Sequence, residues 1–222
     1  MTTDQTSVIA GAVKTIADAI ALVLVLPLGA AAGLEHRLRP NAEGVFHFCA
    51  HALALLPGLP GAYLRRAFYR LTLDRCHALC HIGFGAMFTH REVLVGRGVY
   101  LGTWALVGSA DLREGTSIGS RASLLSGTEL HEFRDGEWTP FDAGKLRQIV
   151  LGPHTFVGEG AIVMADVGPR TMVTAGAVVA SAVPAGIVVA GNPARFVRRL
   201  EPLPDAPDAA DAAAAAAAEA HR

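Results

Sequence analysis

The most regular feature of this sequence is an aliphatic residue that returns about every six positions between Val95 and Val183. A Gly often follows it, and a small or β-branched residue stands four positions after it. The aliphatic positions are Val95, Leu101, Val107, Leu112, Ile118, Leu124, Leu151, Val157, Val163, Val173 and Val179. Neither the period of a half-buried strand nor that of a helix gives this spacing. The pattern therefore predicts a repeated unit of one very short strand and one turn.

Stacking such units predicts a mainly β protein with a parallel β-helix, in which three six-residue sides close one coil. The large aliphatic residue fills the interior, and its small partner leaves room for the next coil. We expect the Gly after each aliphatic residue to serve where the backbone turns, because Gly reaches positive φ freely. Ordinary sandwich strands would need wider spacing and tight hairpin signals, which this segment lacks.

The end of the repeat carries motifs that resemble a known family. They are Val163-Met-Ala-Asp-Val-Gly-Pro, Thr174-Ala-Gly-Ala-Val-Val and Ala190-Gly-Asn-Pro-Ala-Arg195. With them, the chain from Val95 to about Arg198 resembles the hexapeptide-repeat acyltransferases, and most closely the sugar and polysaccharide O-acetyltransferases. The resemblance implies a left-handed β-helix, a homotrimer and acetyl-CoA as acyl donor. The left hand is a property of the family, since the usual crossover rule would predict the opposite hand.

The sequence divides into three regions: an apolar helical region (1–81), the β-helix domain (82–200) and a disordered Ala/Pro-rich tail (201–222). Residues 62–79 have the pattern of an amphipathic helix. Polar residues 130–147 interrupt the repeat, and insertions in solenoids often lie on the working face. After Pro193 we expect a short helix or strand to seal the open end of the solenoid.

Two uncharged spans, residues 19–34 and 44–64, lie in the N-terminal region. The first is shorter than the roughly 20 residues of a spanning helix, and the second is broken by Pro and Gly. We therefore expect residues 8–70 to form a re-entrant or interfacial hairpin on the membrane, with Arg65, Arg66 and Arg70 at the lipid head groups.

The alternative is that both spans pack on the β-helix or on neighbouring subunits. A secretory signal would also fit the apolar run after Lys14. The use of coenzyme A favours the cytoplasm, so the expected location is the inner face of the cytoplasmic membrane.

Charge and cysteine content narrow the function classes. With a formal net charge of −1 and no basic stripe, the chain has no electrostatic basis for binding nucleic acid. Cys76 and Cys80, next to His77 and His81, could bind a metal, but no second ligand pair of structural-zinc spacing follows. We therefore expect no metal, and buried thiols in a reducing compartment.

His131 is the candidate catalytic residue, because it stands at the base of the insertion, at the end of Ser126-Gly-Thr-Glu-Leu-His131. A hydroxyl that attacks a thioester must lose its proton, and a His suits this task near neutral pH. The resemblance implies the same role, since His131 matches the family's catalytic position. The alternative is a solvated loop histidine. Glu129 and Glu132 are the nearest groups that could hold its second ring nitrogen.

Two other histidines are weaker candidates. His90 precedes the regular coils and is more often structural at such a place, although a neighbouring subunit could bring it near the site. His154 stands at a turn of a later coil. A metal site like that of γ-carbonic anhydrases needs three converging histidines, and only His131 and His154 lie inside the regular coils.

The resemblance places the coenzyme A groove along the later coils. The matching positions are Phe156, Gly158, Glu159, Ala175, Gly176, Ala180, Ser181, Arg195 and Arg198. Phe156 replaces the usual Trp, Glu159 replaces a small residue, and the usual phosphate-facing lysine is absent. Arg195 and Arg198 could bind the nucleotide phosphates, unless they are plain surface charges.

The expected function is acetyl transfer from acetyl-CoA to a sugar hydroxyl of a polysaccharide, a glycolipid or their precursor. Trp138 and Phe141 of the insertion could stack on the sugar face, or bind a hydrophobic acceptor. One alternative is an acetyltransferase for an amine or a small antibiotic-like alcohol. Another is a non-catalytic β-helix that serves as a trimerisation scaffold, against which the insertion and His131 argue.

Overall fold

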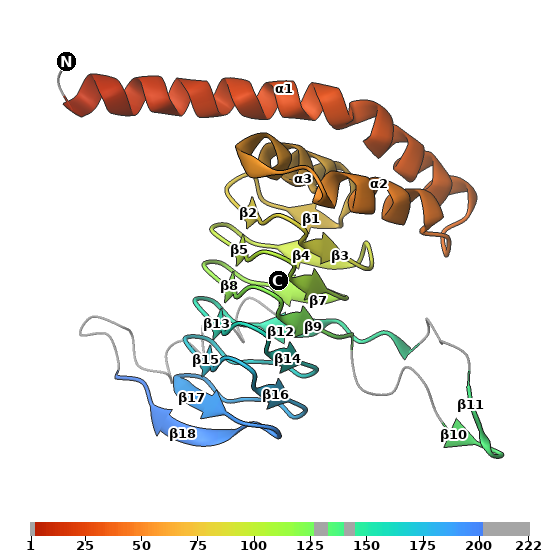
Figure 1. Cartoon of the computed structure of the whole chain (residues 1–222), viewed down its shortest axis with the longest axis vertical. Helices are drawn as coiled ribbons and strands as arrows, with labels where there is room; N and C mark the ends of the chain where they lie inside the picture. Colours follow the sequence, from red (N-terminus) through yellow and green to blue (C-terminus); the bar gives the residue numbers. More distant parts are fainter. Residues whose placement is uncertain (1–2, 127–132, 140–144, 202–222) are drawn as a thin grey trace, which may run out of the picture.

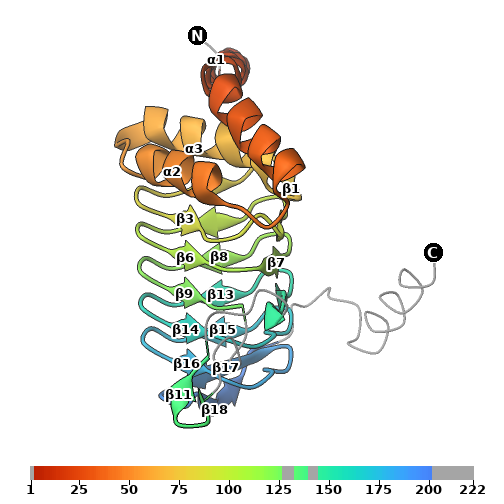
Figure 2. The same ribbon diagram turned by 90° about the vertical axis from the view of Figure 1, so that its right-hand side faces the viewer.

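A computed structural model describes residues 3–126, 133–139 and 145–201 of the chain (Figure 1). Three helices come first: α1 (Thr3–Leu38), α2 (Gly44–Ala54) and α3 (Gly58–Thr72). They cover one end of a column of short strands, and α1 lies across that end, outside α3 (Figures 1 and 2). Pro27 lies inside α1. The N-terminal region is thus a helical cap on the β structure.

The strands stack as a parallel β-solenoid of about six coils, whose three sides we call A, B and C. Side A holds β1 (Arg75–Cys76), β4 (Val93–Val95), β7 (Ala110–Leu112) and β12 (Ile149–Leu151). Side B holds β2 (His81–Ile82), β5 (Tyr100–Leu101), β8 (Ser117–Ile118), β13 (Phe156–Val157), β15 (Met172–Val173) and β17 (Ile187–Ala190). Side C holds β3 (Met87–Phe88), β6 (Leu106–Val107), β9 (Ser123–Leu124), β14 (Ile162–Val163) and β16 (Val178–Val179). The predicted parallel β-helix is confirmed.

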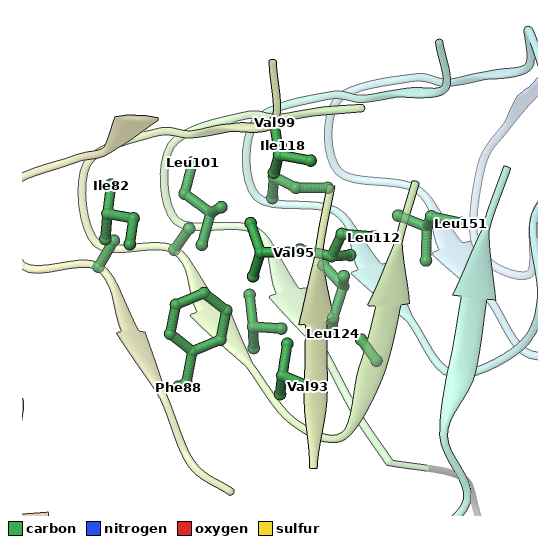
Figure 3. Close-up of a cluster of buried hydrophobic side chains, with 14 of the residues drawn as sticks. Ile82, Phe88, Val93, Val95, Val99, Leu101, Leu112, Ile118, Leu124 and Leu151 are labelled. Carbon is green, nitrogen blue, oxygen red and sulfur yellow. The ribbon is translucent and has the colours of Figure 1, made fainter. Parts of the chain in front are cut away.

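The interior of the solenoid is built from the predicted aliphatic positions. All eleven of these side chains, from Val95 to Val179, are at most 1% exposed. Leu101, Ile118 and Leu124 point into the same apolar interior as Leu112 and Leu151 (Figure 3). The small partners, such as Ala105 and Ala122, are buried as well. Each coil therefore buries its own apolar stripe against the coils above and below it.

The expected reason for the repeated Gly residues is wrong. Positive φ occurs at other glycines, such as Gly98 and Gly115, and at non-Gly corner residues such as His154. The glycines after the aliphatic residues instead face the backbone of the next coil. A Cβ on Gly102 would lie 2.6 Å from the Ser120 nitrogen, and one on Gly158 would lie 2.3 Å from the Ala175 nitrogen. Close approach of stacked coils, not turning, excludes side chains there.

The insertion leaves the solenoid between β9 and β12, at the corner between sides C and A. Despite the insertion, β12 pairs with β7 in parallel, with Leu151 opposite Leu112. Part of the insertion forms an antiparallel hairpin of β10 (Phe133–Arg134) and β11 (Glu137–Trp138). This hairpin projects away from the column (Figure 1). The insertion therefore interrupts the chain without interrupting the stack.

The two ends of the solenoid differ from the expectation in detail. Helix α3 ends at Thr72, not at Leu79, because the following residues pair with the next coil: Asp74 N–H donates to Arg91 O at 3.1 Å and His77 N–H to Val95 O at 2.9 Å. At the other end, the expected seal is a strand, β18 (Arg195–Arg199), which pairs antiparallel with β17.

Arg65 fixes the helical cap to the first coil. Its side chain is 1% exposed, and its guanidinium donates to Leu53 O at 3.1 Å, Leu56 O at 2.7 Å and Ile82 O at 3.1 Å. Leu53 lies in the last turn of α2 and Leu56 lies two residues beyond its end, where the helical hydrogen-bond pattern stops. The expectation that Arg65 meets lipid head groups is therefore wrong.

Replacing Arg65 by Leu should lower the free energy of unfolding by about 3–5 kcal/mol, because buried carbonyls of α2 and β2 lose a charged donor. Arg70→Leu is the matched control, since Arg70 is exposed and its loss should change stability by only about 0.5 kcal/mol. Urea unfolding followed by circular dichroism measures both values. Equal stability of the two variants would contradict the role of Arg65.

Gly102→Ala should destabilise the protein by about 1–3 kcal/mol, because two hydrogen-bonded coils must move apart to admit the methyl group. Gly33→Ala is the control, because it should leave the stability unchanged or increase it. A Cβ at Gly33 meets nothing within 4 Å, and Ala is the better helix former. Thermal unfolding midpoints should fall for the first variant and stay or rise for the second.

Candidate active site

The corner where the insertion starts and ends is well defined, although His131, Glu129, Glu132 and Phe141 lie outside the described residues. Ser126 O accepts the N–H of Arg147 at 2.9 Å, so the two ends of the insertion meet. The buried Ser126 Oγ accepts the N–H of Ser109 at 2.7 Å. Ser126 and Arg147 are therefore anchored at the corner between sides C and A.

Asp166 ties the returning end of the insertion to the next coil along the same corner. One carboxylate oxygen accepts the N–H of Val150 at 2.9 Å, and the other accepts from the Arg147 guanidinium at 2.8 Å. Ala180 and Ser181 occupy this corner one coil further on, and both are exposed. The corner thus runs as one continuous edge from the insertion to the closing end of the solenoid.

Trp138, a predicted acceptor contact, lies on β11 and is 70% exposed. The ring of Phe133, on β10, lies 5.4 Å from it, centroid to centroid, in an edge-to-face arrangement. Sequence reasoning missed Phe133. The signal was present in Asp135-Gly136, where both residues have positive φ as a tight hairpin turn requires. That turn places the two aromatic residues opposite each other.

The predicted coenzyme A positions divide into separate groups. Gly158, Glu159, Ala175 and Gly176 share the corner between sides B and C, where Gly176 N–H donates to Glu159 O at 2.8 Å. Phe156 lies on side B, partly exposed between Ser117 and Met172. Neither group faces the corner of the insertion. Within one chain these residues do not form a single groove.

The third group gathers at a groove of about 450 Å³ near the closing end of the solenoid. Ala180, Ser181 and Arg195 line it, together with Phe196 and Arg199. Arg198 does not line it. Sequence reasoning chose Arg198 over Arg199, because an irregularity between Val188 and Val189 in the pairing of β17 with β18 cannot be read from the motif.

The other candidate histidines have structural contacts. His90 Nδ1 lies 2.9 Å from the carboxylate of Glu43, just before α2. Burial opposes ionisation of Glu43, but its hydrogen bonds with His90 and the Arg91 N–H outweigh burial and hold the pKa below its ordinary value. His154 is exposed at a corner between sides A and B, away from the insertion.

Possible metal ligands are sparse in the part of the chain that the structure describes. There, Glu43, His90 and Glu92 are the one group of three close enough to share an ion, and hydrogen bonds already occupy Glu43. The thiols of Cys76 and Cys80 lie 3.7 Å apart. The hydrogen bond with Cys80, together with burial, raises the pKa of Cys76, so this thiol stays protonated near neutral pH.

No family model and no curated protein sequence matches this chain. Two solved structures are similar over most of their length. A maltose O-acetyltransferase from Clostridium difficile 630 has 16% identity and a TM-score of 0.56, over 70% of this chain and 86% of that one. A hexapeptide-repeat-containing acetyltransferase from Vibrio cholerae O1 biovar eltor, in complex with acetyl coenzyme A, has 18% identity and a TM-score of 0.57, over 70% and 87%. The chain therefore has the β-solenoid fold of the hexapeptide-repeat acetyltransferases.

Proposed function

We propose that this protein transfers an acyl group, most simply acetyl, from acyl-CoA to a sugar hydroxyl of a polysaccharide, a glycolipid or their precursor. One observation carries the proposal: the insertion leaves the solenoid at a corner that continues along the stack to a groove lined by two arginines. The fold shared with an acetyltransferase that binds acetyl-CoA supports the same reaction class.

In this proposal His131 is the general base. The hydroxyl oxygen attacks the thioester carbonyl while the imidazole takes its proton. Backbone N–H groups of the corner stabilise the oxyanion, and its collapse expels the thiolate of coenzyme A. The imidazolium then returns the proton to that thiolate. No covalent enzyme intermediate is needed, because the thioester already carries a good leaving group.

The groove at the closing end is suited to the nucleotide part of coenzyme A. Arg195 and Arg199 supply cationic donors for phosphate, and Phe196 supplies an apolar surface. Stacked coils repeat every 4.8 Å or so, which puts the groove about 10 Å from the insertion. The pantetheine arm can extend along the exposed edge at Ala180 and Ser181 between them.

A homotrimer accounts for the remaining predicted positions. In one chain, Glu159 and Phe156 face away from the corner of the insertion. If three solenoids pack side by side, the B–C corner of one subunit can face the C–A corner of the next. The two halves of the expected coenzyme A set would then meet between subunits.

The aromatic pair of the insertion favours a sugar acceptor. Phe133 and Trp138 are both exposed on the same short hairpin. Flat aromatic faces suit the apolar face of a sugar ring while leaving its hydroxyls free. The proposal keeps Phe141 as a further acceptor contact. Use of acyl-CoA places the reaction in the cytoplasm.

His131→Ala should lower kcat by about 10²–10⁴-fold with little change in the affinity for acyl-CoA. Release of coenzyme A thiol in the presence of sugar acceptors measures the rate, and gel filtration checks the assembly. His154→Ala is the matched control and should keep full activity, because His154 lies at a different corner. Undiminished turnover in His131→Ala would refute the assignment.

Arg199→Ala should raise the KM for acyl-CoA about tenfold and leave kcat nearly unchanged, because it removes a charged contact to phosphate. Arg97→Ala, at an exposed corner far from the groove, should behave as wild type.

Coenzyme A should also raise the melting temperature of the wild type saturably. No shift at millimolar coenzyme A would favour a non-catalytic scaffold.

A further inference from the structure

Helix α1 has two apolar faces, and the rest of the chain covers one of them. The covered face carries Ala21, Val25 and Ala32, which are all buried and point toward α3 and the first coil. Asp18 and Glu35 continue this face at spacings of three and four residues. This is the spacing of a helix packed along a partner.

The opposite face carries large aliphatic side chains that are exposed. Ile16, Ile20, Val23, Leu34 and Leu38 are 55–73% exposed. At 3.6 residues per turn, they lie roughly opposite the buried set. Among the described residues, Gly11–Leu38 is the one stretch of helix long and apolar enough to cross a membrane. A helix that is apolar on all sides is normally covered on all sides.

Polar contacts near the middle of α1 and near its C-terminal end hold it against the rest of the cap. Asp18 forms an ion pair with Arg66 of α3. The Arg91 guanidinium donates to Ala32 O at 3.2 Å and to the Glu35 carboxylate at 3.1 Å. A helix that crossed a bilayer would have to break both anchors, so these contacts argue against a spanning orientation.

Glu35 also joins α1 to the start of α2. Its carboxylate accepts the N–H groups of Val45 at 2.7 Å and Phe46 at 3.2 Å. Burial opposes its ionisation, but these N–H groups and Arg91 outweigh burial and lower its pKa. The anchor is therefore ionised at neutral pH. The first part of helix α1 runs across the end of the solenoid, and its last part bends toward α2 (Figures 1 and 2).

The charges around this end favour an anionic partner. Between residues 11 and 72, the carboxylates are Asp18, Glu35 and Glu43, and each is paired with an Arg or a His. Four exposed Lys and Arg side chains in the same range have no ion pair with any described residue: Lys14, Arg37, Arg39 and Arg70. Unbalanced positive charge beside an apolar helix face matches the head groups of anionic lipids.

We propose that α1 is an in-plane membrane helix, whose outer face lies in the interface of a bilayer that contains anionic lipids, with the solenoid standing upright on it. A second copy of the chain fits this face less well. The face points away from the end of the solenoid, where side-by-side subunits do not reach it, and two such ends would oppose like charges. Membrane binding here does not depend on the acyl transfer proposed above.

The test uses the full chain and vesicles of phosphatidylcholine with or without phosphatidylglycerol. The protein should sediment with the anionic vesicles. Ile20→Glu with Val23→Glu should weaken that binding at least about tenfold without lowering the melting temperature, because both side chains are exposed. Val197→Glu is the matched control: Val197 is 53% exposed on β18, at the opposite end, and its replacement should leave binding intact.

Two further measurements test the contribution of positive charge to binding and the orientation of α1 in the bilayer. Arg37→Gln with Arg39→Gln should weaken binding to anionic vesicles by about fivefold per arginine, and high salt should do the same. A thiol introduced by Gln5→Cys, near the start of α1, should stay fully reactive to a membrane-impermeant maleimide added outside the vesicles. A spanning helix would protect it.

The His131→Ala variant should bind vesicles as the wild type does. Vesicle binding and catalysis are therefore tested by separate measurements, and one proposal can fail without the other. Three results would overturn the in-plane helix: no binding to anionic vesicles, binding unchanged by the glutamates at Ile20 and Val23, or protection of the Gln5→Cys thiol. Self-association without lipid that the same glutamates abolish would show that a second copy covers the face instead.

Discussion

The structure depends on the distance between one coil and the next. Main-chain hydrogen bonds hold the coils at strand spacing, which leaves no room for a Cβ where two corners meet. The Ser120 nitrogen would stand 2.6 Å from a Cβ on Gly102. This constraint explains why Gly follows six of the eleven buried aliphatic residues of the repeat. It also aligns the corners into straight edges, so the insertion and the closing groove come to lie on one edge.

The two ends of the solenoid are covered in different ways, one by the helical cap and the other by an antiparallel strand. At the first coil, the buried guanidinium of Arg65 joins the carbonyls of α2 to that of Ile82. The helical cap thus covers the unpaired edge of the stack. The Arg65 guanidinium is its buried polar group, and apolar side chains such as Phe46 and Phe68 are buried in the same cap. At the other end, β18 turns back on β17 in the antiparallel sense, which stops further parallel addition. The cap carries α1, and the turned-back strand carries the arginines of the groove.

The sequence predicted the parts of the fold that depend on local periodicity. Every aliphatic position of the repeat is buried, because a six-residue unit points the same side chain inward on each side. The helix boundary at Thr72 and the burial of Arg65 could not be predicted, since both follow from contacts with residues distant in the chain. The coenzyme A positions came from motifs, and motifs do not say which side of a prism a residue occupies. This is why Phe156 and Ser181 lie apart within one chain.

The stack of coils also acts as a spacer of fixed height. The insertion starts at the end of the third coil, below two layers of helix. Two coil spacings and the thickness of the helical layers add to about 30 Å. With α1 resting on a bilayer, a sugar attached directly to a lipid would lie too close to the membrane to reach the corner. Among acceptors attached to a lipid, only a glycan long enough to rise that far could present its hydroxyl there, so the height of the column would select these acceptors by length.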